Sequence, residues 1–105
     1  FRPSFMLSHL RDRMTEALER ATEVEQLLAD PETTKDAARL ADLGREHHRL
    51  AEVVAKANRL AKAEQELADA REMASGDDAD FVAEARAEVT RLEAECAALE
   101  KALLP

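Results

Sequence analysis

Apolar side chains recur every three or four residues along most of the chain, a spacing typical of helices that each bury one stripe. Two short interruptions rich in Asp, Pro, Gly, Ser or Thr divide this pattern, at residues 30–34 and 75–78. The pattern therefore predicts three helices, over about 5–29, 35–74 and 79–103.

The three helices share one buried stripe pattern. In the first segment the stripe is expected at Leu7, Leu10, Met14, Ala17, Ala21, Val24 and Leu28. In the second it is expected at Leu40, Leu43, His47, Leu50, Val54, Ala57 and Ala61, with Leu60 and Leu67 as the better seam toward the end. In the third it is expected at Val82, Ala85, Val89, Leu92, Cys96, Leu99 and Leu103.

Short connections force consecutive helices to run antiparallel. The sequence therefore predicts an all-α fold, an elongated antiparallel three-helix bundle made of coiled-coil hairpins that share the long central helix. The first and third helices are expected to overlap near the middle of the second, which would give a three-helix section there.

Helix ends are predicted from capping residues. Ser4 or Pro3 is expected to open the first helix and Asp30-Pro31 to close it, because the residue before a proline is disfavoured in the α conformation. Gly44 interrupts the second helix and is interpreted as a point of close approach by the first helix, with a bend as the alternative. The expected N-caps are Thr33 or Thr34 for the second helix and Asp77, Asp78 or Asp80 for the third.

Composition narrows the structural class further. The 105 residues suffice for one domain, and the low aromatic content of 3% with only two Gly argues against a β or α/β fold. One cysteine forms no intramolecular disulfide, and no stretch approaches the ~18 consecutive apolar residues of a membrane span. No signal peptide is recognisable at residues 1–10. We therefore expect a soluble, cytoplasmic protein without a membrane partner.

Charge is distributed unevenly around a net value of −8. Residues 35–62 carry seven bases and four acids, whereas residues 63–105 carry four bases and twelve acids. On an ideal helix, four cations of the second segment fall within roughly 80° of one another. These candidate RNA contacts are Arg45, Arg49, Lys56 and Arg59. The candidate protein contact is an acidic tip at Asp77, Asp78 and Asp80, which would repel nucleic acid, and no DNA partner is expected.

No catalytic or metal-binding pattern is present, and no cofactor is expected. Cys96 occupies a stripe position and is interpreted as a core residue. His47 also lies on the stripe, whereas His9 and His48 are expected to be exposed, and adjacent histidines on a helix cannot chelate one metal ion together. Glu16 and Arg20 form a favourable i,i+4 pair. The sequence therefore does not favour an enzyme.

Four blocks, in this order and spacing, resemble the N-terminal helical domain of bacterial class I peptide chain release factors. They are Leu27–Glu32 (LLADPE), Leu43–Leu50 (LGREHHRL), Glu66–Met73 (ELADAREM) and Leu103–Pro105 (LLP). The resemblance covers residues 6–105 as one helical domain. It departs from the family where an aromatic usually stands at His47 or His48. The form that reads UAA and UAG is the closer one, because the UAA and UGA form typically carries Trp-rich segments here. Residues 1–5 lie upstream of the family's usual start and are interpreted as a tail or an expression remnant.

The resemblance implies a part in translation termination, in which the full factor reads a stop codon and promotes hydrolysis of peptidyl-tRNA. The family's Gly-Gly-Gln and codon-reading motifs are absent here. The implied partner is the ribosome, through protein and rRNA of the large-subunit GTPase-associated region. The alternative is a generic coiled-coil interaction or dimerisation module that pairs through Leu60 and Leu67. For a release-factor domain we expect at most weak self-association.

Overall fold

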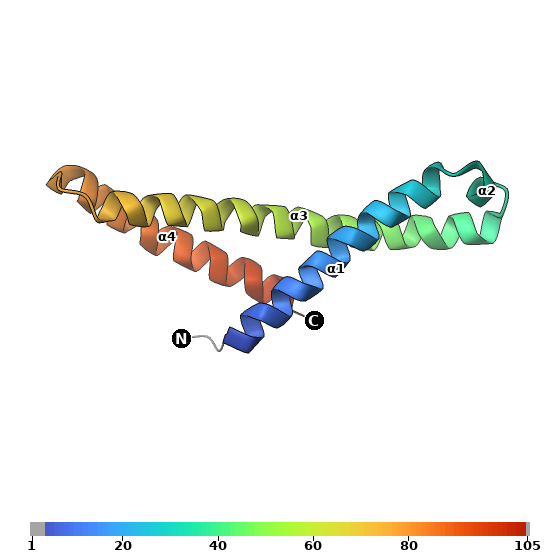
Figure 1. Ribbon diagram of the computed structural model, residues 1–105, viewed down its shortest axis with the longest axis horizontal. Coiled ribbons are helices and arrows are strands. Elements are labelled where there is room, and N and C mark those ends of the chain that lie inside the picture. Colours follow the sequence, from blue (N-terminus) through green and yellow to red (C-terminus); the bar gives the residue numbers. More distant parts are fainter. Residues whose placement is uncertain (1–3, 105) are drawn as a thin grey trace. The chain divides into compact units, whose positions relative to one another are not determined.

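The computed structural model describes residues 4–104, with side chains described from residue 8 onward (Figure 1). Its helices are α1 (Ser4–Ala29), α2 (Pro31–Thr34), α3 (Ala37–Ala74) and α4 (Ala79–Leu103). No strand occurs between residues 4 and 104, which confirms the all-α class. The predicted opening at Pro3 and the side chain of Leu7 lie outside what the structure describes, whereas Ser4 is the first residue of α1.

The chain divides into two compact units, Phe1–Ala55 and Lys56–Pro105. The long helix α3 contributes to both: its first part joins α1 and α2, and its last part joins α4 (Figure 1). Each unit is thus a helical hairpin, as expected for hairpins that share a long central helix. The three-helix section would lie between the units and stays a prediction.

In unit 1 the predicted stripe is buried at Leu10, Val24 and Leu43. Met14, Ala17, Ala21 and Leu28 are half-buried on the same side of α1. An ion pair joins α1 to α3, between Arg20 and Glu46. The hairpin of unit 1 therefore combines a thin apolar seam with a polar contact at its flank.

The turn of unit 1 differs from the sequence prediction. Asp30, not Thr33 or Thr34, acts as an N-cap: its Oδ1 accepts a 3.0 Å hydrogen bond from the Glu32 backbone N–H, and Pro31 follows at the first position of α2. Proline is favoured there because its missing N–H would have no helical partner. Thr33 is instead buried, with 1% of its surface exposed.

The start of α3 is correspondingly later than predicted. Asp36 precedes Ala37, and its side chain accepts a 3.1 Å hydrogen bond from the Arg39 backbone N–H. Its carbonyl accepts from the N–H of Leu40 at 2.9 Å. Asp36 therefore caps the start of α3, the role predicted for Thr33 or Thr34. Those two threonines lie within the short helix α2 instead.

Unit 2 has the more continuous core. From α3 it buries Ala57, Leu60, Ala63, Leu67 and Ala70, and from α4 it buries Ala85, Leu92, Cys96 and Leu99. The predicted change of seam in α3 is confirmed, since Leu60 and Leu67 are buried and Ala61 is exposed. Four of these nine residues are alanines and four are leucines, and the larger leucine side chains supply most of the buried apolar surface.

At the turn of unit 2, the structure selects one of the three predicted caps. Asp78 has an extended backbone, and its Oδ1 accepts hydrogen bonds from the backbone N–H groups of Asp80 at 3.0 Å and Phe81 at 3.5 Å. Its carboxylate also lies at the positive end of the α4 dipole, where a negative charge is favourable. The first turn of α4, including Phe81, is therefore held at the tip by its cap.

The structure also corrects the prediction that the first helix approaches closely at Gly44. This glycine lies inside α3, exposed, and a Cβ built there would contact nothing within 4 Å. The interpretation as a point of close approach by the first helix is therefore wrong. A small residue here serves no packing purpose in the described structure.

Candidate functional site

The three aspartates of the acidic tip, Asp77, Asp78 and Asp80, are exposed at the end of unit 2. Two large apolar residues, Met73 at 55% and Phe81 at 56% exposure, share this end of the hairpin with them. The tip therefore offers apolar surface as well as negative charge.

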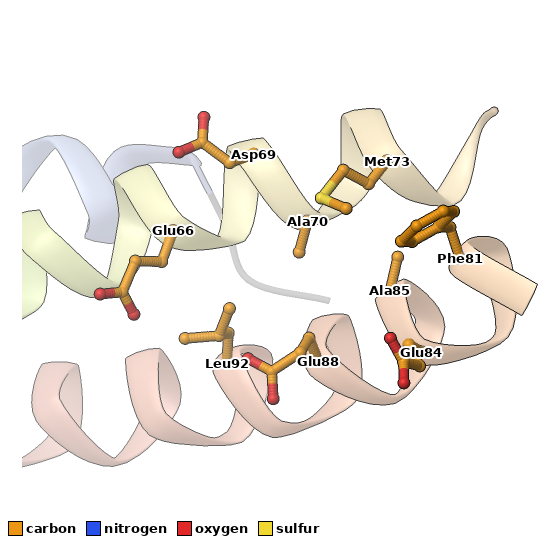
Figure 2. Close-up of a pocket in the computed structure, with 9 residues that line it drawn as sticks. All are labelled: Glu66, Asp69, Ala70, Met73, Phe81, Glu84, Ala85, Glu88 and Leu92. Atoms are coloured by element: carbon orange, nitrogen blue, oxygen red, sulfur yellow. The ribbon is translucent and has the colours of Figure 1, made fainter.

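A groove of about 290 Å³ lies between α3 and α4 just behind the tip (Figure 2). Ala70, Ala85 and Leu92 form its apolar base, and Met73 and Phe81 lie at the end nearest the turn. The remaining lining residues are the carboxylates Glu66, Asp69, Glu84 and Glu88. We call this feature the tip groove. All its charged lining residues are acidic.

The four candidate basic residues of α3 differ in how exposed they are and in whether they form ion pairs. Arg45 and Arg49, in unit 1, are exposed, and Arg45 forms an ion pair with Asp42 one turn earlier. In unit 2, Lys56 is half-buried and Arg59 is exposed. Arg49 is thus the candidate of unit 1 whose charge is least compensated, although it lies near enough to Glu46 to help lower the pKa of that carboxylate.

A second groove of unit 2, of about 270 Å³, contains Arg59 and mixes both signs of charge. Its lining is Arg59, Lys62, Ala63, Glu66, Arg91 and Glu95. Arg91 already forms two ion pairs, with Glu88 at 2.9 Å and with Glu95 at 3.2 Å. These bonds lower the pKa of Glu88 and raise that of Arg91. The groove therefore combines three cations with two carboxylates, and its Arg91 is already paired, so it is a weaker candidate for binding an anion than a purely basic surface.

The described pair with the best geometry links α1 and α3 in unit 1. The Arg20 guanidinium donates to both carboxylate oxygens of Glu46, from Nε at 2.7 Å and from Nη2 at 2.8 Å. It also lies 3.1 Å from Glu23, so the predicted pairing with Glu16 is replaced by these two partners. These hydrogen bonds lower the pKa of Glu46 against the opposing effect of desolvation and raise that of Arg20. A two-bond arginine–carboxylate pair fixes geometry as well as charge.

We expect Glu46→Gln to lower the Tm at neutral pH but not in acid. The folded-state pKa of Glu46 lies below its ordinary value of 4.5. The stabilisation is therefore complete above that ordinary value and is lost as the pH falls through the folded-state pKa. Thermal unfolding followed by circular dichroism from about pH 7 to pH 3 would show the two Tm values converging in acid. Glu19→Gln, at an exposed glutamate of α1, is the matched control. A Tm difference independent of pH would contradict this interpretation.

The cysteine and the histidines were the residues considered as nucleophiles or metal ligands. Cys96 is buried at 4% exposure, as predicted for a core residue. His47 is only half-buried, with Nε2 3.8 Å from Glu25, whereas His9 and His48 are exposed as predicted. Among the residues that the structure describes, no group of three or more His, Cys, Asp or Glu side chains could hold a metal ion. None of the helices in the described part is both long and apolar enough to cross a membrane.

Sequence reasoning missed Met73 and Phe81. Phe81 lies four residues before Ala85 and eleven before Leu92, so it shares the apolar face of the third helix, but the predicted stripe began one residue later, at Val82. In a chain with only three Phe, no Tyr and no Trp, an aromatic on this face beside the three tip aspartates is the signal that could have identified this site.

Comparison with known proteins supports the resemblance over most of the chain. The PCRF domain family matches residues 17–105. A peptide chain release factor 1 from Methylibium petroleiphilum is 38% identical over 101 residues, covering 91% of this chain and 27% of the relative. The corresponding factor from Bifidobacterium longum subsp. infantis is 39% identical over 87 residues, covering 83% and 23%. A third, from Akkermansia muciniphila, is 37% identical over 83 residues, covering 79% and 22%.

No solved structure matches the chain. The chain spans about a quarter of the length of these curated relatives. The family match and the relatives agree on one identity for this helical segment. The chain belongs to the PCRF domain family, the N-terminal helical domain of class I peptide chain release factors.

Proposed function

We propose that this chain is a ribosome-docking module that assists stop-codon-dependent release of the nascent chain. The observation that carries the proposal is the PCRF match over residues 17–105, together with relatives that are each a peptide chain release factor 1. That kind of relative also supports a parent factor of the UAA- and UAG-reading type. In this proposal residues 6–105 act as one domain in the cytoplasm, and codon reading and catalysis belong to other parts of the factor.

Two features support docking without catalysis of its own. The only thiol, Cys96, is buried in the unit 2 core, where it cannot act as an accessible nucleophile. The exposed features of the same unit are charged or apolar surfaces, which suit binding to a partner. We therefore assign the chain the role of positioning the factor on the ribosome.

Charge assigns different partners to different surfaces of the domain. The exposed arginines Arg45 and Arg49, together with Lys56 and Arg59, are proposed to lie near rRNA, because cations bind phosphates by releasing counterions. The acidic tip at Asp77, Asp78 and Asp80 is proposed to contact a basic ribosomal protein, since it would repel RNA. Both contacts are proposed for the large-subunit GTPase-associated region.

Reversal of Arg45, Arg49 and Lys56 to Glu in the full-length factor tests the rRNA contact. We expect weaker ribosome binding at low salt and a slope of log affinity against log salt that is shallower by about two to three. Equilibrium binding across salt concentrations measures both quantities. Lys101→Glu, at an exposed lysine of α4, is the control for a general change in charge. Ribosome affinity that is unchanged at every salt concentration would remove the rRNA contact.

The coiled-coil alternative loses its proposed interface in this structure. It required Leu60 and Leu67 to pair with another chain, but these residues are 3% and 8% exposed within unit 2. The seam is therefore already covered by the chain itself, which favours the release-factor domain.

A further inference from the structure

The tip groove combines features that rarely occur together on a surface that contacts only solvent. Two large apolar side chains, Met73 and Phe81, are more than half exposed beside a base of buried residues. Exposed apolar surface bordered by polar groups is typical of protein interaction sites. Because Phe81 lies in the first turn of α4, where its backbone N–H donates to the Asp78 cap, the cap fixes its backbone before any partner arrives.

The size of the groove limits what can occupy it. Its volume of about 290 Å³ is just below the ~300–1,000 Å³ range of small-molecule sites, and it is lined by two helices rather than enclosed. Inserted side chains of a protein segment fit such a groove. A partner helix is the suitable form of segment, because a helix can lay its apolar residues between two antiparallel helices.

The rim of the groove sets the charge of the partner. Glu66, Asp69, Glu84 and Glu88 line it without a cation, and the acidic tip adjoins it. Only part of this charge is compensated: Glu88 pairs with Arg91, which also lies close enough to Glu66 to interact with its charge, whereas the hydrogen bond from Gln65 to Asp69 brings no positive charge. Lysine or arginine side chains flanking an apolar anchor would complement this rim.

The same charges argue against other occupants. Phosphates would be repelled by the four rim carboxylates, which disfavours RNA. In a second copy, the equivalent groove lies in the segment 63–105, which carries twelve acids and four bases, so two such grooves would also repel each other.

We propose that the tip groove binds a basic amphipathic helix of a ribosomal protein, with one of its apolar side chains inserted beside Met73 and Phe81. This inference rests on the proposed docking function and deepens it. In this inference the protein contact lies in the tip groove, with Phe81 as the apolar anchor. The three tip aspartates lie around it and supply negative charge.

Phe81→Ser in the full-length factor tests the anchor. We expect ribosome affinity to fall about tenfold, as for a central apolar contact of an interface, while the Tm changes little because Phe81 is 56% exposed. Phe81→Leu should restore most of the affinity. Unchanged affinity of Phe81→Ser would overturn the anchor, even though the domain would still dock.

Photo-crosslinking from position 81 tests the partner. We expect a benzoylphenylalanine there to react with a ribosomal-protein peptide in which Lys or Arg flanks an apolar residue at helical spacing. The same probe at Ala83, an exposed position roughly opposite on α4, should give no such product. Crosslinks to rRNA, to a second copy or to nothing, in a factor that still binds ribosomes, would overturn the inference alone. A factor whose ribosome binding does not depend on residues 6–105 would overturn the proposed function as well.

Discussion

Leu92→Ala is expected to destabilise the isolated chain by about 3 kcal/mol and to lower its Tm by roughly 10–20 °C. Leu92 is 1% exposed, and its neighbours at the base of the tip groove include Ala70 and Ala85. Alanines have no flexible side chain that could move into the space left by the leucine. The cavity would therefore remain largely open, and its cost would add to the lost burial of apolar surface.

Urea unfolding followed by far-ultraviolet circular dichroism measures this effect. The midpoint should fall while the slope of free energy against urea stays the same, because the surface exposed on unfolding hardly changes. Leu104→Ala is the matched control, since Leu104 is 45% exposed, and its effect should stay within ~0.5 kcal/mol. Similar losses for Leu92→Ala and Leu104→Ala would show that unit 2 lacks the packed core described here.

The helices and their buried faces could be predicted because the repeat along the chain is itself the physical cause of burial. Ala85, Leu92, Cys96 and Leu99 follow one another at steps of four, seven or three residues, so any helix places them on one face. The same reasoning located the seam at Leu60 and Leu67. These positions could therefore be found from the sequence alone, whereas Val82, Val89 and Leu103 of the same stripe are only half-buried.

Which of several neighbouring residues caps a helix was harder to predict, because the alternatives are similar in energy. Asp30, Thr33, Thr34 and Asp36 are all residues that can cap a helix. The structure uses Asp30 and Asp36 because Pro31 begins an additional short helix that buries Thr33. Gly44 was interpreted as a point of close packing, with a bend as the alternative, and the open space around it rules out the packing.

Features that depend on how two helices are placed against each other were beyond prediction from one sequence. Arg20 can reach several glutamates, and only the relative placement of α1 and α3 brings Glu46 to its guanidinium. The tip groove likewise depends on the rotation of α3 and α4, which leaves Phe81 exposed beside Met73. The candidate acidic tip could be identified from charge, but its apolar anchor could not.

Removal of residues 6–105 from the full-length factor is expected to impair binding rather than chemistry. A docking module contributes equally to the ground state and the transition state, so its loss raises KM and leaves kcat nearly unchanged. We expect KM for stop-codon-programmed ribosomes to rise about 10–100-fold, equivalent to ~1.4–2.8 kcal/mol of binding free energy, with kcat within about twofold.

The most direct test of the docking role is peptide release measured over a range of factor concentrations, with and without residues 6–105. Circular dichroism of the truncated factor should first show that its remaining domains are folded. Our account predicts release at the same maximal rate but at a much higher factor concentration. A maximal rate that collapses while KM stays the same would contradict it, because the domain would then take part in the chemical step instead of docking the factor on the ribosome.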